Sequence, residues 1–217
     1  LPMGAFAAGT GAGADVENSV SAQEAAVTLS HEGGTIEAGH YIMEGGKYTG
    51  GFTIDTTGDV TIDITGEVNA ELSTTFITAT QVGTLTINGS ENGQNHKISV
   101  KATDYDCGGI VKVEKAEKAV LNGGDYEVTA EESGLNPSAI YSSAALELND
   151  VSATDSIGTV VDANGDLVVK GGSYNGEYGI STSGTTTIDG CKIVGEYNAV
   201  NVQGGTTTID GGDFSIT

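Results

Sequence analysis

Apolar and polar residues alternate in short stretches along this chain, and the stretches recur. The clearest phrase is Gly184-Thr-Thr-Thr-Ile188-Asp189-Gly190, which returns 21 residues later at 205–211. Alternation of this kind predicts a β-strand with one buried face, and recurrence at such a period is typical of a solenoid. Weaker copies, 19 to 34 residues apart, extend the pattern into one inward column of about eight coils: Ile36, Ile62, Ile87, Leu121, Leu148, Val169, Ile188 and Ile209.

A second apolar column follows the first by five residues. We assign it to the core of a second strand, and the coil phrase leaves room for a third short strand before the next repeat. The abundance of glycine, 34 residues, suits turns that require positive φ. The second column comprises Tyr41, Tyr126, Ala153, Tyr174, Ile193 and Phe214.

The amino-terminal region is predicted to differ from the stranded coils. Within residues 16–32, a short helix is expected at 21–32, because Ser21 and Glu24 form a capping-box pattern and Gly33 suits a helix end. Such a helix would cover the open edge of the first coil. Residues 1–15 are interpreted as the remnant of a secretory signal or a flexible linker, and residues 16–217 as one β-helix domain. Because residue 217 closely follows a strand start, we expect a longer protein.

The coils resemble a known architecture. The helix followed by Gly33-Gly34-Thr35-Ile36 and Gly39-His40-Tyr41, with the repeats through Gly212, is similar to the pectate-lyase-like superfamily. The resemblance implies an all-β fold, a right-handed single-stranded parallel β-helix with a short amino-terminal capping helix. It covers nearly the whole chain, but this architecture has many functions, so the function has to be argued from sites.

The charge balance is strongly acidic. Thirty acids face eight bases, all lysine, for a net charge of −22. This charge repels nucleic acid and anionic membrane surfaces, and no apolar run is long enough to span a membrane. We therefore expect a monomer that neither binds nucleic acid nor inserts into a membrane. A host or environmental glycan, or a surface protein, is the expected partner.

An outward ladder of polar residues is expected beside the first column. Its members are Glu37, Asp63, Asn88, Asn122, Asn149, Lys170, Asp189 and Asp210. The three asparagines could hydrogen-bond amide to amide. Related enzymes combine acids with a basic residue, so Lys170, Asp189 and Asp210 are the catalytic candidates. The ladder lacks a histidine at that end, and a solvated acidic face is the favoured interpretation.

Two other groups of residues suggest ligand sites. Asp162, Asn164 and Asp166 carry oxygen donors at alternate positions, as in the first half of a calcium loop, although Ser173 stands where the last glutamate would be. Weakly bound calcium is thus a possible cofactor, but a turn is the favoured interpretation. Tyr178 and Tyr197 occupy matching turns one coil apart, where they could stack on a sugar or simply shield the turn.

The two cysteines belong to different coils. The expected four steps of about 4.8 Å between Cys107 and Cys191 far exceed the reach of a disulfide. We therefore expect two free thiols, with Cys191 buried and Cys107 nearer the surface.

Together these features favour a non-catalytic extracellular or cell-surface β-helix that serves as a stalk or as an adhesive, carbohydrate-binding surface. The alternative is a polysaccharide lyase or glycoside hydrolase on the same coils. A scaffold that displays the insertions Ser90–Lys97 and Ala130–Ser138 is a third reading that sequence does not separate from the first.

Overall fold

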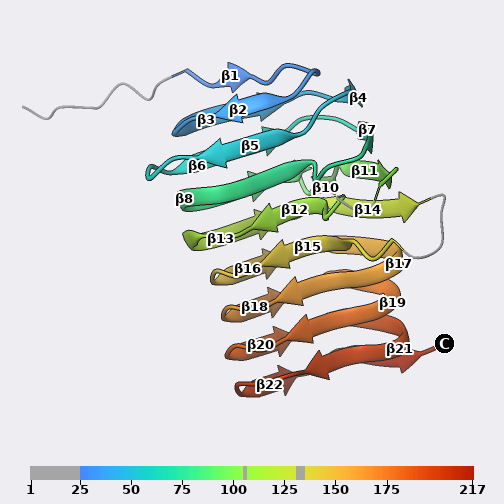
Figure 1. Ribbon diagram of the computed structural model, residues 1–217. Coiled ribbons are helices and arrows are strands. Elements are labelled where there is room, and N and C mark those ends of the chain that lie inside the picture. Colours follow the sequence, from blue (N-terminus) through green and yellow to red (C-terminus); the bar gives the residue numbers. More distant parts are fainter. Residues whose placement is uncertain (1–24, 105–106, 131–134) are drawn as a thin grey trace, which may run out of the picture.

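The computed structural model describes residues 25–104, 107–130 and 135–217, and within them every regular element is a strand. Twenty-one strands pair into one network, and β9 with β10 forms a separate antiparallel pair. The strand pairings within the larger network are parallel, and Figure 1 shows the strands stacked along one axis. The all-β prediction is confirmed, and the stack is consistent with a β solenoid. The described residues contain no helix that could cross a membrane.

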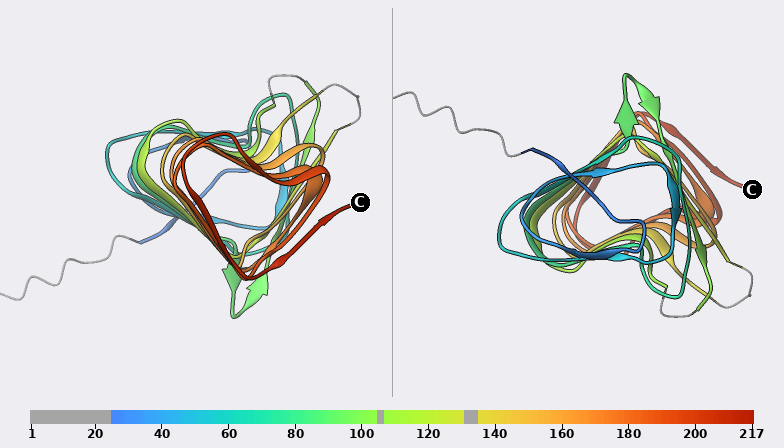
Figure 2. Two further views of the ribbon diagram at one scale, coloured as in Figure 1. Left: turned by 90° about the horizontal axis from the view of Figure 1, so that it is seen from below. Right: turned by 90° about the horizontal axis from the view of Figure 1, so that it is seen from above.

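Seen along the stack, the coils trace a roughly triangular outline (Figure 2). We call its sides the first, second and third faces, in the order in which the chain visits them. The first face contains β1 (Val27–Thr28), β3 (Gly39–Met43), β6 (Val60–Ile64), the second half of β8 (Ile77–Asn88), β13 (Ala116–Asn122), β16 (Leu146–Asn149), β18 (Leu167–Lys170), β20 (Thr186–Asp189) and β22 (Thr207–Asp210). The eight first-face strands from β3 to β22 agree with the predicted number of coils.

The other two faces share several long strands that bend at a corner. The second face contains β4 (Gly46–Tyr48), β7 (Val68–Leu72), β11 (Lys97–Ala102), β14 (Asp125–Ala130), the first halves of β17 (Ser152–Ala163), β19 (Ser173–Thr182) and β21 (Lys192–Val202), and β23 (Asp213–Ile216). The third face contains β2 (Gly34–Ile36), β5 (Phe52–Asp55), the first half of β8, β12 (Gly109–Val113), β15 (Ser138–Ser142) and the second halves of β17, β19 and β21.

The first apolar column is confirmed from the second member onward. The register pairs, in order, Ile62, Ile87, Leu121, Leu148, Val169, Ile188 and Ile209. The placement of Ile36 was wrong: it is buried on β2 of the third face, where it pairs with Ile54. Only two residues separate β2 from β3, so Tyr41 rather than Ile36 reaches the first-face position above Ile62.

The second column is confirmed from Tyr126 through Ala153, Tyr174 and Ile193 to Phe214. Tyr41 does not belong to it, for the reason just given. In the upper coils, Val68 and Ile98 hold the positions above Tyr126. Aromatic packing is concentrated in this upper part, where the rings of Tyr48, Phe52 and Phe76 meet edge to face.

The predicted helix at 21–32 is wrong over its described part, while residues 21–24 and the predicted leader or linker 1–15 lie outside the described residues. Residues 25–32 contain strand β1, whose Val27 pairs with Tyr41 and whose Thr28 pairs with Ile42. β-Branched residues favour extended backbone, and the edge of β3 presents unpaired backbone groups that a strand satisfies. Gly33 does have positive φ, +80°, but it closes a turn in which its N–H donates to the carbonyl of Ser30 over 3.1 Å.

The last coil leaves apolar side chains uncovered. Ile209 is 49% exposed, although it continues the buried column. Val202 on the third face and Ile216 on the second are also exposed. These side chains occupy inward register positions, but no described strand lies beyond them.

One short hairpin interrupts the regular coils. It consists of β9 (Ser90–Glu91) and β10 (Gln94–Asn95), joined by Asn92 and Gly93, which both have positive φ. Such an Asn-Gly pair is favoured in two-residue hairpin turns. The hairpin projects from one corner of the triangle (Figure 2), and Asn95 Nδ2 donates to the carbonyls of Gly124 and Asp150.

Candidate functional site

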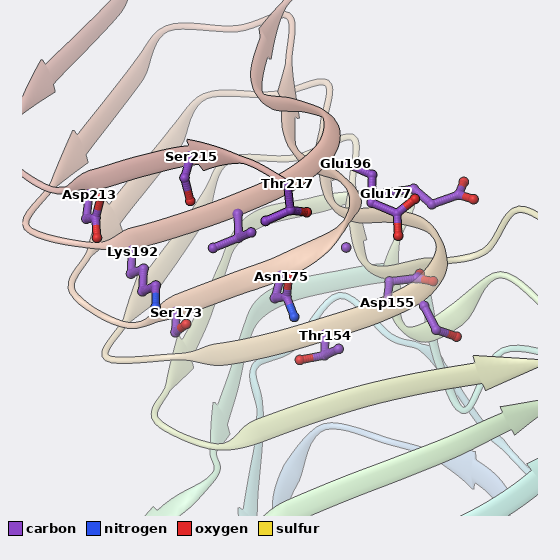
Figure 3. Close-up of a pocket in the computed structure, with 13 residues that line it drawn as sticks. Thr154, Asp155, Ser173, Asn175, Glu177, Lys192, Glu196, Asp213, Ser215 and Thr217 are labelled. Atoms are coloured by element: carbon purple, nitrogen blue, oxygen red, sulfur yellow. The ribbon is translucent and has the colours of Figure 1, made fainter.

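A groove of about 800 Å³ runs over the lower coils of the second face. Figure 3 shows the residues that line it, contributed by β17, β19, β21 and β23 and by Thr217, which follows β23. We call it the second-face groove and define it by Thr154, Asp155, Ser156, Ser173, Asn175, Gly176, Glu177, Lys192, Val194, Glu196, Asp213, Ser215 and Thr217.

Strand alternation builds the floor of the groove. Tyr174 and Ile193 point inward and are fully buried, so the residues on either side of each point outward. The parallel register then stacks these outward residues, about 4.8 Å apart, into rows. One row is Ser173, Lys192 and Asp213, and the next is Thr154, Asn175, Val194 and Ser215. The floor is therefore mostly hydroxyl and amide groups.

Charged groups stand at the two ends of the groove. Figure 3 places Lys192 and Asp213 at one end, and Glu177 and Glu196 at the other. Lys192 is exposed, and no described carboxylate lies within ion-pair distance of its ammonium group. The middle of the groove is left neutral, which suits an uncharged polar ligand.

Tyr178 and Tyr197 stack on each other just past the corner that follows the acidic end, and neither is among the residues that line the groove. Each follows a glutamate of the groove directly in sequence, and their ring centroids lie 5.2 Å apart at 27°. Tyr197 is 59% exposed. The predicted pairing of these rings across neighbouring coils is confirmed, while their role in sugar binding stays a prediction.

Asp155 lies under the same end of the groove and was not recognised from the sequence. Its side chain is completely buried, and its Oδ1 accepts the N–H of Ile157 over 3.1 Å, whereas Oδ2 has no hydrogen-bond partner. Burial raises the pKa of this carboxyl to about 7. Strand alternation is the sequence signal that indicates its burial, because Asp155 follows the inward Ala153 by two residues.

The three catalytic candidates lie in one row on the first face. Lys170 pairs with Asp189, and Asp189 with Asp210, in the register of β18, β20 and β22. However, Lys170 Nζ donates to Glu147 Oε1 over 2.7 Å, and Lys118 also bonds Glu147. These two ammonium groups hold the pKa of Glu147 down at about 2. The lysine is therefore engaged with a glutamate that the sequence interpretation had not included.

The predicted asparagine ladder is present and longer than expected. Asn149 Nδ2 donates to Asn122 Oδ1, and Asn122 Nδ2 donates to Asn88 Oδ1, each over 2.9 Å. Asn88 in turn donates to Asp63 Oδ1 over 2.7 Å, and His40 Nε2 lies 2.7 Å from Asp63 Oδ2. Glu37 is not a member, because β3 and not β2 belongs to this face.

The calcium candidates have separate surroundings. Asp162 is half-buried on β17, and burial raises its pKa. Asn164 instead contacts Tyr141 and Ser183, and Asp166 Oδ1 accepts the N–H of Thr185 over 2.9 Å. Among the described residues, no group of three or more His, Cys, Asp or Glu side chains is arranged to hold a metal ion. Asn164 and Asp166 tether one coil to the next.

Both cysteines are free, as predicted. Cys191 is 1% exposed, as expected, but Cys107 is only 3% exposed and not near the surface. The backbone N–H of Cys107 donates to the carbonyl of Asp104. Burial raises the pKa of both thiols, that of Cys191 to about 11.

Comparison with known proteins adds no assignment to this geometry. No protein-family model, no curated protein and no solved structure matches the chain. The functional argument therefore rests on the site itself.

Proposed function

We propose that this protein is a non-catalytic extracellular β-helix that binds a carbohydrate in the second-face groove. We also propose that its coils form a right-handed parallel β-helix of the pectate-lyase-like kind, in a bacterial-type surface protein. The observation that carries the binding proposal is the row of hydroxyl and amide groups on the groove floor, together with the Tyr178–Tyr197 stack past the corner that ends the groove.

A sugar presents hydroxyl groups at its rim and apolar C–H groups on its ring faces. Ser173, Asn175 and Ser215 supply donors and acceptors for the hydroxyls. The exposed ring of Tyr197 supplies an apolar face with a polar tip. The net charge of −22 and the acidic end of the groove disfavour a polyanionic chain, so a neutral glycan is the expected ligand.

Retention on a panel of immobilised neutral and acidic polysaccharides tests this proposal. We expect the wild-type chain to be retained on a neutral member without cleaving it. Asn175→Ala and Tyr197→Ala should each weaken binding about tenfold, equivalent to about 1.4 kcal/mol. Tyr141→Ala is the matched control, because Tyr141 lies on β15 of the third face, away from the groove. Retention that neither groove substitution affects would exclude this groove as the binding site.

A polysaccharide lyase or hydrolase is the second candidate, favoured only by the row of Lys170, Asp189 and Asp210. The same panel distinguishes it, because an enzyme would shorten a polysaccharide and Asp189→Asn would abolish the shortening. If the protein neither binds nor cleaves any polysaccharide of the panel, the role of a stalk or scaffold remains.

A further inference from the structure

Asp155 occupies a position that the fold otherwise gives to apolar residues or glycine. The register places it between Val128 of the coil above and Gly176 of the coil below. The same inward row contains Tyr48, Ala70 and Val100 higher in the stack. Burying an aspartate here destabilises the folded protein unless its carboxyl group is hydrogen-bonded or neutral.

Backbone N–H groups from two coils act on this carboxyl. Oδ1 accepts the N–H of Ile157, and the backbone N–H groups of Gly158 and of Ala139 in the coil above also favour the ionised carboxyl. Oδ2 nevertheless has no partner. Burial outweighs these contacts, so the carboxyl keeps its proton to a higher pH than an exposed aspartate.

Asp155 begins the corner at which β17 passes from the second face to the third. The register of β17 with β19 shifts between Asp155 and Thr159. This corner is packed tightly against the coil above, because a Cβ on Gly158 would lie 2.1 Å from the carbonyl oxygen of Pro137. Asp155 and Ser156 also line the groove, so the corner forms one of its ends.

Two titratable groups among the described residues interact with this carboxyl. Glu177 on β19 raises its pKa further, and Cys107 before β12 is coupled to it. The other packed elements contribute Val128 of β14 and Ala139 of β15, which carry no charge. Ionisation of Asp155 is thus opposed from below by a like charge and is not compensated by a lysine.

We infer that Asp155 is a pH-dependent latch. By this we mean a side chain that keeps the corner and the adjoining end of the groove in the folded conformation while its carboxyl is neutral, and lets both open more often when it ionises. The unfolded chain releases this proton near pH 4, its ordinary value. Stabilisation by Asp155 is therefore complete below about pH 4, declines as the pH rises through about 7, and is lost above it.

Hydrogen exchange at the amides of Ile157 and Gly158 tests the latch without any ligand. After correction for intrinsic exchange rates, we expect their protection in wild-type protein to fall roughly tenfold or more between pH 5 and pH 8. In Asp155→Asn, whose side chain is always neutral, protection should be the same at both values. The exposed-site control Asp55→Asn, on β5 of the third face, should show the same fall in protection as the wild type. Equal protection of the wild-type amides at both pH values, or a wild-type response in Asp155→Asn, would overturn the latch.

If Asp155→Asn does not fold, the carboxyl of Asp155 can be titrated by carbon NMR in wild-type protein. A midpoint near 7 supports the inference, and one below 5 contradicts it.

The consequence for ligand binding rests on the function proposed above, whereas the latch does not. For a polysaccharide retained by the wild type, we expect tighter binding at pH 5 than at pH 8, and no such difference in Asp155→Asn. A latch seen by hydrogen exchange in a protein that retains no polysaccharide would refute the proposed function alone. Retention without pH-dependent protection would refute the latch alone.

Discussion

Two acidic side chains show how local surroundings decide a residue's protonation. Asp155 is buried without a cation, and its pKa rises to about 7. Glu147 lies between the ammonium groups of Lys118 and Lys170, and its pKa falls to about 2. Strand alternation already separates them, because Glu147 lies between the inward Leu146 and Leu148 whereas Asp155 follows the inward Ala153 by two residues. The difference arises because Asp155 points inward and Glu147 outward.

Replacing Glu147 by Gln tests the pair of lysine contacts. The folded protein holds this carboxyl ionised below its ordinary pKa, so its contribution is present above about pH 4 and disappears as the pH falls toward 2. Because both lysines are about half exposed, we expect a loss of only about 1 kcal/mol at pH 7, smaller in high salt. Urea denaturation followed by circular dichroism measures it.

The control for this measurement is Glu117→Gln, which removes the same charge at an exposed position of β13. An equal effect of the two substitutions at pH 7 would show that net charge, and not the lysine contacts, is responsible.

At the scale of the strand, identical local sequences meet different surroundings. β20 and β22 share the segment Thr-Thr-Ile-Asp and pair with each other. Ile188 of β20 is completely buried, whereas Ile209 of β22 is about half exposed. Coils above and below β20 cover its inward face, but β22 has a described neighbour on one side only.

We therefore expect Ile188→Ala to lower the free energy of unfolding by about 2–5 kcal/mol, since it leaves a cavity in the core. The matched substitution Ile209→Ala should cost less than about 1 kcal/mol, because water already reaches that side chain. Chemical denaturation of both variants measures the contrast. Equal costs would mean that Ile209 is covered in solution.

The asparagine ladder is also a property of whole strands. A carboxylate can only accept hydrogen bonds, so Asp63 requires Asn88 to present its amide nitrogen. That orientation leaves Asn88 Oδ1 to accept from Asn122, and the same order passes on to Asn149. One acid thus sets the direction of three amides across successive coils.

At the scale of the whole molecule, the stacking order separates the two cysteines. Cys107 precedes β12 and Cys191 precedes β21, with the coils of β13, β16 and β18 between them. Both thiols are buried, and burial raises the pKa of each. They are therefore shielded from reagents as well as from each other.

Thiol titration without reductant should find two reactive groups in denaturant. In native protein at pH 8 we expect both to react at least about tenfold more slowly, because the thiolate is disfavoured and access is blocked. Cys191→Ser and Cys107→Ser assign the two reactions. Absence of reactive thiols in denatured monomer would require a disulfide and contradict the register.

The sequence by itself determined the repeating strand, the inward column from Ile62 to Ile209, the free thiols and the contacts among the asparagines. These follow from period-two alternation and a recurring phrase, which are properties of neighbouring residues. Only the tertiary structure decided that residues 27–28 form a strand, that Tyr41 replaces Ile36 in the column, and that Cys107 is buried. It also decided the partner of Lys170 and left Oδ2 of Asp155 without a hydrogen-bond partner. Each of these depends on which coil lies above or below, and that depends on loop lengths and corner geometry rather than on local pattern.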